Sequence, residues 1–285
     1  MDAFRLVERW PVDHATVGVV DIGAQSDEVT TTGPSRRAFA WASVTKMTTA
    51  LAVLVAVEEG TLLVDEPAGP AGSTVRHLLA HASGLGPGPG PPLAPPGTSR
   101  IYSNVGFEVL GSLLAERSGL PFEDYVRQGV LEPLALSGAT LDAAAGEGAA
   151  AAGMSGTVHD LLALGCEWAV PTLVSRATRD EATTDQFPGL AGVLPGFRRF
   201  DPCPWGLGVE IRGDKWPHWT GSANSPATFG HFGQSGSFLW VDPVAGVVCG
   251  GLGDRPFGPW AARVWPELSD AVLAEVAGRR SGGVG

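Results

Sequence analysis

The strongest constraint on the fold is one long apolar segment near the start of the chain. Residues 43–59 read SVTKMTTALAVLVAVEE and are followed by Gly60, a residue that commonly comes directly after a helix. Apolar residues lie on nearly every side of the helix that this segment predicts, so the helix must be buried and central. A chain of 285 residues with 44% hydrophobic and 17% charged content is long enough to surround it.

The order of the other elements predicts the fold class. Short β-like runs and helical patterns follow one another as strands, helices, strands and a final helix, with Thr157 as one helix N-cap. The strand candidates are Ala15–Asp21, Glu28–Thr32, Trp205–Arg212, Ala227–Phe232, Ser237–Asp242 and Val247–Gly251, and the further helix candidates are Thr74–His81, Gly106–Ser118, Phe122–Val130, Thr157–Val170 and Trp260–Ala277. This order predicts an α/β (α+β) fold, an antiparallel sheet flanked by terminal helices with an inserted all-helical subdomain.

We predict a single domain over residues 1–285. Its α/β part covers about 1–65 and 197–285, and its helical subdomain covers about 66–196. Two other segments have no regular pattern. Gly84–Gly97 is almost entirely Gly and Pro and predicts a stiff loop, whereas Ala143–Ala152 is rich in Ala and Gly and predicts a flexible surface stretch.

Charge and cysteine content exclude several functions. The formal net charge of −11 argues against binding to nucleic acid or an anionic membrane, because phosphate groups need a basic surface. No export signal is visible, and the longest apolar stretch, Ala50–Val57, is too short to span a bilayer. Cys166, Cys203 and Cys249 are interpreted as reduced, buried thiols, since they lie far apart and are odd in number. These features predict a cytoplasmic protein without a membrane span.

Ser43 and Lys46 are the first candidates for chemistry. They lie three residues apart at the start of the apolar helix, so the hydroxyl and the amine share a helix face. A lysine that is removed from water can lose its proton and then accept the proton of a serine. The pair indicates a serine nucleophile with its activating base. The alternative is a serine N-cap beside a solvated lysine.

Tyr102 and Asn104 form the second candidate group. Only two tyrosines and two asparagines occur in the chain, and one of each stands in the Tyr-Ser-Asn sequence at 102–104. A phenol can relay a proton between nucleophile and leaving group. The Asn104 amide can bind a substrate carbonyl or hold Lys46 in place. The alternative is a turn in which Tyr102 packs and Asn104 caps the next helix.

The third candidate group is the segment GHFGQSG at residues 230–236. Glycine at 233 lets the backbone approach a ligand closely. The N–H of Gln234, together with the N–H of Ser43, could form an oxyanion hole. His231 could supply a hydrogen-bond donor that faces the site. The alternative is a histidine with a purely structural role.

These motifs together resemble one superfamily, that of the serine β-lactamases, penicillin-binding proteins and family VIII esterases. Ser43-x-x-Lys46, Tyr102-x-Asn104 and His231-x-Gly233 stand in its order and spacing. Flanking blocks agree with it, namely HLLAHASGL, APPGTSRIYSNVGFEVLGSLLAERSG, MSGTVHDLLAL and GHFGQSGSFLWVDP. The likeness covers about residues 15–252 and implies a β-lactamase/transpeptidase-like fold.

The resemblance also implies roles for the candidate residues. Ser43 would be the acylated nucleophile, Lys46 its activating lysine and Tyr102 the general acid and base. Asn104 would contact the substrate amide, and His231 would replace the lysine of the family's Lys-Thr-Gly motif. The N–H groups of Ser43 and Gln234 would form the oxyanion hole beside Gly233. The implied substrate is a small ester, amide or short peptide, without metal or cofactor, and no oligomeric state is predicted.

One departure from the family pattern concerns the substrate. Phe232 stands where β-lactam binders usually carry Thr or Ser, and the missing hydroxyl weakens the case for penicillin recognition. This favours an esterase, amidase or D-amino-acid peptidase. True β-lactamase or penicillin-binding activity stays an alternative, as does a ligand-binding descendant of the fold without turnover. His77 and His81 have a spacing that suits a metal, but no third ligand lies near them in the sequence.

Overall fold

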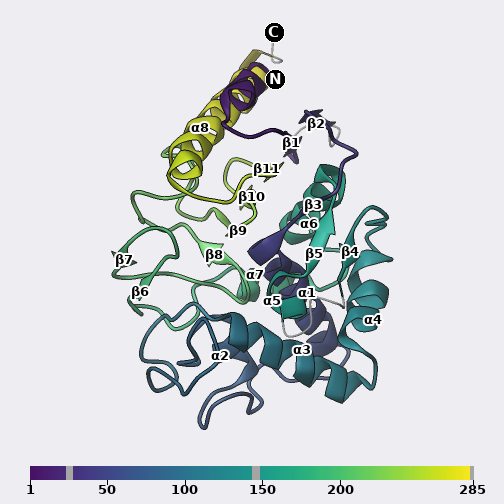
Figure 1. Ribbon diagram of the computed structural model, residues 1–285, viewed down its shortest axis with the longest axis vertical. Coiled ribbons are helices and arrows are strands. Elements are labelled where there is room, and N and C mark those ends of the chain that lie inside the picture. The colour runs from purple at the N-terminus through teal and green to yellow at the C-terminus, as the bar shows by residue number, and fades with distance from the viewer. Residues whose placement is uncertain (24–27, 143–147, 283–285) are drawn as a thin grey trace.

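The computed structural model describes residues 1–23, 28–142 and 148–282 (Figure 1). The α-helices are α1 (Thr45–Glu58), α2 (Val75–Leu79), α3 (Asn104–Ser118), α4 (Phe122–Val126), α5 (Ala149–Ala152), α6 (Val158–Ala169), α7 (Arg176–Ala182) and α8 (Pro259–Gly282). The 3-10 helices are η1 (Asp2–Arg9) and η2 (Ala42–Val44), and the π-helix is η3 (Arg127–Leu131). The strands are β1 (Ala15–Asp21), β2 (Glu28–Thr32), β3 (Phe39–Ala40), β4 (Thr140–Leu141), β5 (Met154–Gly156), β6 (Gly192–Val193), β7 (Arg199–Phe200), β8 (Glu210–Ile211), β9 (Phe229–Gly233), β10 (Ser237–Asp242) and β11 (Val247–Gly253).

The largest sheet joins the two ends of the chain. Its six strands stand in the order β2-β1-β11-β10-β9-β8, and every neighbouring pair runs antiparallel. Strand β1 lies beside β11, with Ala15 opposite Gly253. The predicted antiparallel sheet is therefore confirmed. Two small sheets, β3-β5-β4 and β6-β7, complete the strands of the described residues.

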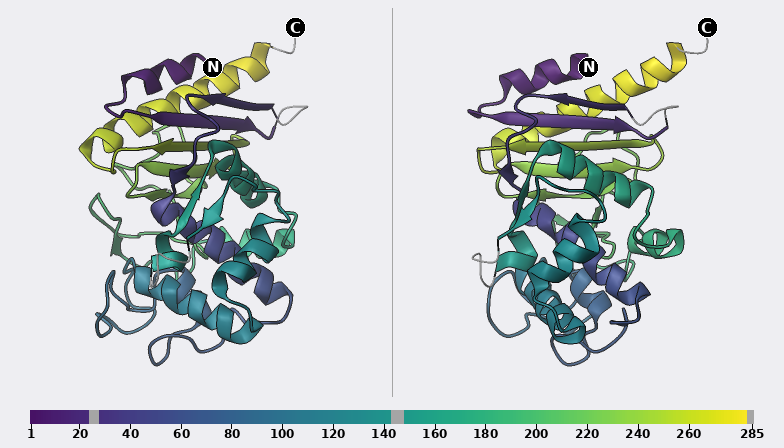
Figure 2. Two further views of the ribbon diagram at one scale, coloured as in Figure 1. Left: turned by 45° about the vertical axis from the view of Figure 1, so that its right-hand side comes forward. Right: turned by 90° about the vertical axis from the view of Figure 1, so that its right-hand side faces the viewer.

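Helices cover both faces of the large sheet (Figure 2). The terminal helices η1 and α8 lie together on one face, and α6 packs on the other. Because side chains alternate along a strand, Val17 and Val19 of β1 join the core under α8, whereas Val20 joins the core on the side of α6. The sheet is thus buried on both faces, and its strands are short apolar runs.

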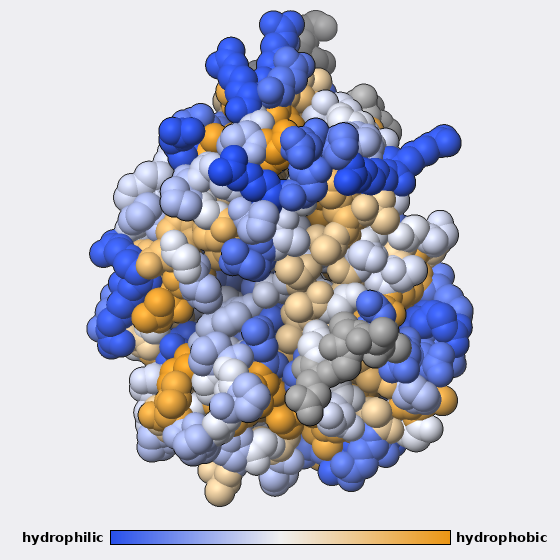
Figure 3. Space-filling model, in the orientation of Figure 1, coloured by the Kyte–Doolittle hydropathy of each residue, from blue (hydrophilic) through white to orange (hydrophobic). Residues whose placement is uncertain are grey.

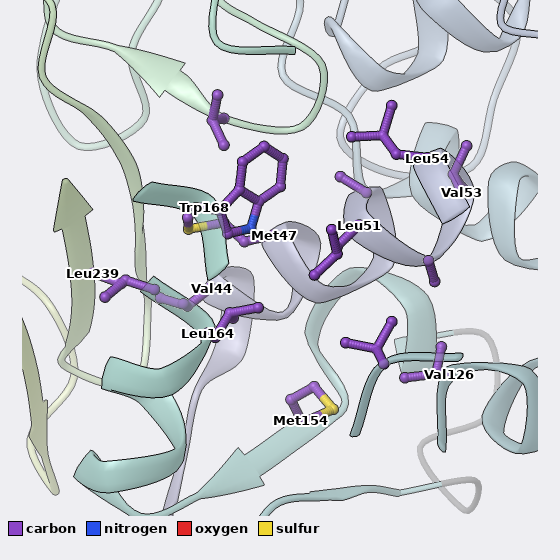
Figure 4. Packing of buried hydrophobic residues seen from close by; sticks show 14 of the residues in the cluster. Val44, Met47, Leu51, Val53, Leu54, Val126, Met154, Leu164, Trp168 and Leu239 are labelled. Carbon is purple, nitrogen blue, oxygen red and sulfur yellow. The ribbon is translucent and has the colours of Figure 1, made fainter. Parts of the chain in front are cut away.

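Helix α1 forms the centre of the larger core (Figure 4). Every residue from Thr45 to Ala56 is buried, which confirms the prediction of a helix surrounded on all sides. Met47 and Leu51 of α1 lie among side chains of other elements, including Trp168 of α6 and Leu239 of β10. A polar group on this helix therefore needs a partner inside the protein.

The prediction of a flexible surface stretch over residues 143–152 is wrong where the structure describes it. Residues 143–147 lie outside the described residues, but Ala149–Ala152 form helix α5, whose middle residues are buried. The hydroxyl of Thr49 in α1 donates a hydrogen bond of 2.7 Å to the carbonyl of Ala150. Polar side chains of the central helix hold α5 in place, and an alanine-rich composition gives no sign of such contacts.

Other differences from the predicted elements are small. Strand β8 is shorter than the run predicted at residues 205–212, because Trp205 forms only an isolated bridge with Glu210. The β-like run predicted at 227–232 becomes β9, and its partner β10 has the predicted bounds. The predicted cap of α6 is confirmed, since the side chain of Thr157 accepts the backbone N–H of Asp160. The division into an α/β part and a helical subdomain stays a prediction.

The surface of the face shown in Figure 3 is mixed in character. Hydrophilic residues gather at the top, over the terminal helices, and apolar residues lie below in small groups between polar ones. Within the described residues, no helix is both long and apolar enough to cross a membrane.

The cap of α6 gives a first prediction. Thr157 and Asp160 form a capping box, in which each side chain bonds the backbone N–H of the other residue. Replacing Thr157 by Ala should lower the free energy of unfolding by about 1 kcal/mol. Thr157→Ser keeps the hydroxyl and should lose less than half of that amount. Urea unfolding of the three proteins measures the difference, and equal midpoints would contradict this role.

Candidate active site

Ser43 lies in the 3-10 turn η2, directly before helix α1. The residue before it, Ala42, has a φ of +44°, in the left-handed region that alanine rarely adopts. Trp41 is held on both sides, since its N–H donates to the carbonyl of Met154 (2.8 Å) and its carbonyl accepts from Ser237 Oγ (2.7 Å). These two hydrogen bonds hold the backbone of Trp41, directly before the turn at Ala42 and Ser43.

Lys46 follows one helical turn later and is fully buried. Its amine donates to Asn104 Oδ1 at 2.8 Å, to the carbonyl of Ala151 at 2.9 Å and to Ser43 Oγ at 3.4 Å. Burial lowers the pKa of Lys46 to about 7, against the opposing charge of Glu108. The alternative of a solvated lysine is thereby wrong. Both protonation states of Lys46, the ammonium and the neutral amine, are therefore populated near neutral pH.

Tyr102 lies on the other side of the same amine. Its ring centroid is 5.0 Å from Lys46 Nζ and 4.5 Å from the ring of His81. Desolvation raises the pKa of Tyr102, although a hydrogen bond with Ser43 acts against this shift. Tyr102 is therefore a protonated phenol at neutral pH, and Lys46 is the neighbouring group that can accept a proton. The phenol bonds Ser43 and lines the same cavity.

Asn104 is the first residue of α3, and the structure separates its two possible roles. The cap of α3 is Ser103, whose hydroxyl accepts the N–H of Gly106 at 2.9 Å, so Asn104 is not the cap. Instead Asn104 Oδ1 accepts from Lys46. Because the oxygen of the amide faces the amine, the NH₂ group of Asn104 is left to donate elsewhere.

Gly233 brings strand β9 close to the chain in front of Ser43. A Cβ atom at this position would lie 2.4 Å from the carbonyl oxygen of Trp41 and 2.4 Å from Ser237 Oγ. Only glycine permits this approach. Gln234 follows at the turn into β10, and its carbonyl accepts the N–H of Phe257 at 2.9 Å. The close contact explains how a strand from the end of the chain reaches the helix that carries Ser43.

His231 lies two residues before Gly233 and is buried. Its Nδ1 forms a hydrogen bond of 2.7 Å with the carbonyl of Phe232. Burial, together with the nearby charge of Lys46, lowers the pKa of His231 to about 3. The ring is therefore neutral at physiological pH. Since a carbonyl only accepts, the proton is on Nδ1 and Nε2 carries a lone pair.

A cavity of about 190 Å³ joins these groups. Its lining residues come from η2, α3, β8, β9 and the connecting loops, and they are Ser43, Tyr102, Asn104, Leu194, Pro195, Trp205, Glu210, His231, Phe232 and Gln234. Lys46 and Gly233 are not among the lining residues, but Lys46 bonds Ser43 and Gly233 packs against Trp41. A larger groove of about 990 Å³ runs along α3 and α5 and shares Asn104 with the cavity. The predicted site residues are thus together in space.

Sequence reasoning missed the charged group beside this cavity. Glu210 is buried, and its carboxylate accepts hydrogen bonds from His218 and from Trp219 Nε1 and forms an ion pair with Lys215. Burial raises the pKa of Glu210, but His218 and Lys215 outweigh it and bring the pKa to about 2. The only sequence signal was that Lys215 is one of two lysines in the chain.

His81 is the second residue whose part at the site was missed. Its Nδ1 accepts the backbone N–H of Ser103 at 3.1 Å, and its ring packs against Tyr102. The φ of His81 is +53°, a conformation that is uncommon for residues other than glycine. His81 therefore fixes both the backbone and the ring in the Tyr102–Asn104 segment. Its spacing from His77 suggested only a metal site.

The fold and the position of Ser43 define a class of protein. An antiparallel sheet covered on both faces, with a serine at the start of a buried helix beside it, is the β-lactamase/transpeptidase-like fold. A family model described as Beta-lactamase matches residues 15–273. The chain therefore belongs to the beta-lactamase family, which confirms the resemblance seen in the motifs. No curated protein matches it.

Solved structures agree with this assignment. A crystal structure of a beta-lactamase from Mycobacterium bovis is 49% identical, with a TM-score of 0.92, over 96% of this chain and 99% of that chain. The hydrolase EstCE1, which has promiscuous acyltransferase activity, is 18% identical, with a TM-score of 0.76, over 95% and 96% of the two chains. A simvastatin synthase variant from Aspergillus terreus is 17% identical, with a TM-score of 0.78, over 97% and 98%. The last two likenesses show the fold alone.

The close approach at Gly233 gives the second prediction. Gly233→Ala should lower the free energy of unfolding by about 1–3 kcal/mol, because the added methyl group forces β9 away from Trp41. Gly253→Ala on strand β11 of the same sheet is the matched control. A Cβ at Gly253 meets nothing closer than 3.4 Å. The free energy of unfolding of this control should therefore change by less than about 0.5 kcal/mol. Equal stability of the two variants in urea would contradict the tight packing at Gly233.

Proposed function

We propose that this protein is a serine hydrolase that forms an acyl-enzyme on Ser43 and cleaves an ester or amide. The observation that carries the proposal is the buried amine of Lys46, 3.4 Å from Ser43 Oγ and with a pKa of about 7. A serine hydroxyl is a weak nucleophile unless a neighbouring base takes its proton. The burial of Lys46 next to Ser43 supplies such a base.

The acylation step follows from the positions of the three groups. Ser43 Oγ attacks the carbonyl carbon while its proton passes to the neutral amine of Lys46, with the Tyr102 hydroxyl hydrogen-bonded to Ser43. The Oγ–C bond forms, and the carbonyl π electrons move to the oxygen. The N–H groups of Ser43 and Gln234 would receive that oxyanion, a contribution of about 3–4 kcal/mol in enzymes of this type.

The second half of the reaction returns the proton. The tetrahedral intermediate collapses, the bond to the leaving group breaks, and the leaving group takes a proton through the Tyr102 hydroxyl, which is replenished from Lys46. Water then attacks the acyl-enzyme and releases the acid, with Lys46 and Tyr102 as base and acid in the same order. Asn104 would donate its NH₂ group to a substrate carbonyl. These steps need no cofactor.

One observation favours a second candidate function, the hydrolysis of β-lactams. The M. bovis structure described as a beta-lactamase is 49% identical to this chain. Against this candidate, the ring of Phe232 lines the cavity where a hydroxyl would assist in binding a β-lactam. Incubation with a penicillin distinguishes the two, because a β-lactam substrate must either be hydrolysed to the ring-opened acid or, where the acyl-enzyme is stable, add its mass to Ser43.

Removal of the nucleophile is the third prediction. Ser43→Ala should lower kcat/KM for 4-nitrophenyl butyrate by at least about 10³-fold, because the acyl-enzyme cannot form. A fluorophosphonate should add one mass increment to the parent protein and none to this variant. Ser281→Ala, on the exposed end of α8, is the control and should behave like the parent. A parent protein without adduct and without turnover would instead support a ligand-binding protein.

The pKa of Lys46 gives the fourth prediction. The amine must be neutral to accept the serine proton, so kcat/KM for an uncharged ester should rise with pH through a midpoint near 7 and then level off. Lys46→Arg should be inactive over the whole range, since a guanidinium does not give up its proton. A rate that is independent of pH between 5 and 9 would rule out Lys46 as the base.

A further inference from the structure

The ring of His231 is part of the lining of the cavity that also contains Ser43. Its Nδ1 is committed to the carbonyl of Phe232, 2.7 Å away. Its Nε2 is buried and has no hydrogen-bond partner in the described part of the chain. Buried polar atoms are nearly always paired in folded proteins. An unpaired acceptor in the wall of a cavity that also contains Ser43 therefore points to a ligand with an O–H or N–H group.

The charged groups around the cavity disfavour an anionic ligand. Glu210 is the charged side chain that lines it, and no lysine or arginine is among its lining residues. An ammonium group has three protons to donate. The amine of Lys46 has three acceptors, and the amine of Lys215 has Glu210 and the carbonyls of Pro204 and Ile211. In the described part of the chain, neither lysine amine is left to receive a carboxylate.

The wall next to His231 is apolar. The ring of Phe232 packs between Phe257, with centroids 4.6 Å apart, and Trp219, with centroids 5.7 Å apart. These contacts fix the ring, and Leu194 lies on the same cavity wall. A carboxylate beside this apolar ring and the lone pair of His231 would lose water without gaining a cationic partner, which is unfavourable. A neutral group with one proton to donate would lose little hydration free energy at the same place.

We propose that His231 Nε2 selects uncharged substrates that carry an O–H or N–H donor near the scissile carbonyl, and that this subsite rejects substrates with a carboxylate there. The inference rests on the proposed serine hydrolase function. It gives His231 a part in substrate choice, as a hydrogen-bond acceptor rather than the donor expected from the sequence.

Two pairs of esters test the proposal on the intact protein. 4-Nitrophenyl 3-hydroxybutanoate and 4-nitrophenyl 3-methylbutanoate have the same shape but differ by a hydroxyl in place of a methyl group. After division by the spontaneous rates, kcat/KM should favour the hydroxy ester by about five- to tenfold, as one neutral hydrogen bond allows. The second pair is 4-nitrophenyl hydrogen glutarate and its methyl ester. The neutral diester should be favoured by at least about tenfold.

Variants assign the preference to His231. His231→Leu should bring the hydroxy-to-methyl ratio close to one, because leucine offers no acceptor. His231→Gln keeps an acceptor oxygen and should retain part of the preference. Leu194→Ala is the matched control in the same wall. It changes the space available to both esters and should leave their ratio as in the parent.

The outcomes separate this inference from the function on which it rests. Equal rates for the hydroxy and methyl esters in the parent would overturn the role of His231 and leave the hydrolase intact. A preference that survives in His231→Leu, or a preference for the glutarate carboxylate, would do the same. Hydrolysis of neither ester, with Ser43 unlabelled by a fluorophosphonate, would overturn both proposals.

Discussion

The burial of one amine determines how the candidate active site is assembled. Lys46 stands on a helix that is enclosed by the core, so its ammonium cannot reach water and must find acceptors inside the protein. Burial of a charge without partners costs several kcal/mol. The acceptors come from three separate segments, namely Ser43 in η2, Asn104 in α3 and Ala151 in α5. The contacts that satisfy the amine therefore also assemble the site.

The large sheet contributes the opposite wall of the site. Strand β9 approaches η2 so closely that position 233 accepts only glycine, and Ser237 of β10 bonds the carbonyl of Trp41. These contacts fix the backbone at Ala42, whose left-handed conformation turns the chain before Ser43. The order of strands explains the geometry, since β10 and β11 connect β9 to β1 from the start of the chain. Both chain ends are thus needed to build the wall that faces the nucleophile.

Those features that depend on local pattern could be predicted from the sequence. The buried helix, the strands at 15–21 and 28–32 and the residue spacings around Ser43, Tyr102 and His231 were all visible, because each depends on neighbours in the chain. Cys203 and Cys249 are buried free thiols, as interpreted, whereas Cys166 is only partly buried, so the interpretation of a buried thiol is wrong for Cys166. The cytoplasmic location and the division into two parts stay predictions.

The features that were missed depend on contacts between distant segments. Helix α5 forms because Lys46 and Thr49 bond its carbonyl groups, and an alanine-rich segment shows nothing of this. Glu210 beside the cavity is neutralised by Lys215 and accepts a hydrogen bond from Trp219 Nε1. The tautomer of His231 depends on one backbone carbonyl. No spacing in the sequence indicates these three-dimensional relations.

The most direct test of this account is the titration of Lys46 itself. The chain has only two lysines, so the protein labelled with ¹³C at lysine Cε should give two resolved NMR signals. The Lys46→Arg variant assigns one of them by its loss. The account predicts that the Lys46 signal titrates with a midpoint near pH 7. A midpoint at the value of a solvated lysine, above about 10, would contradict it.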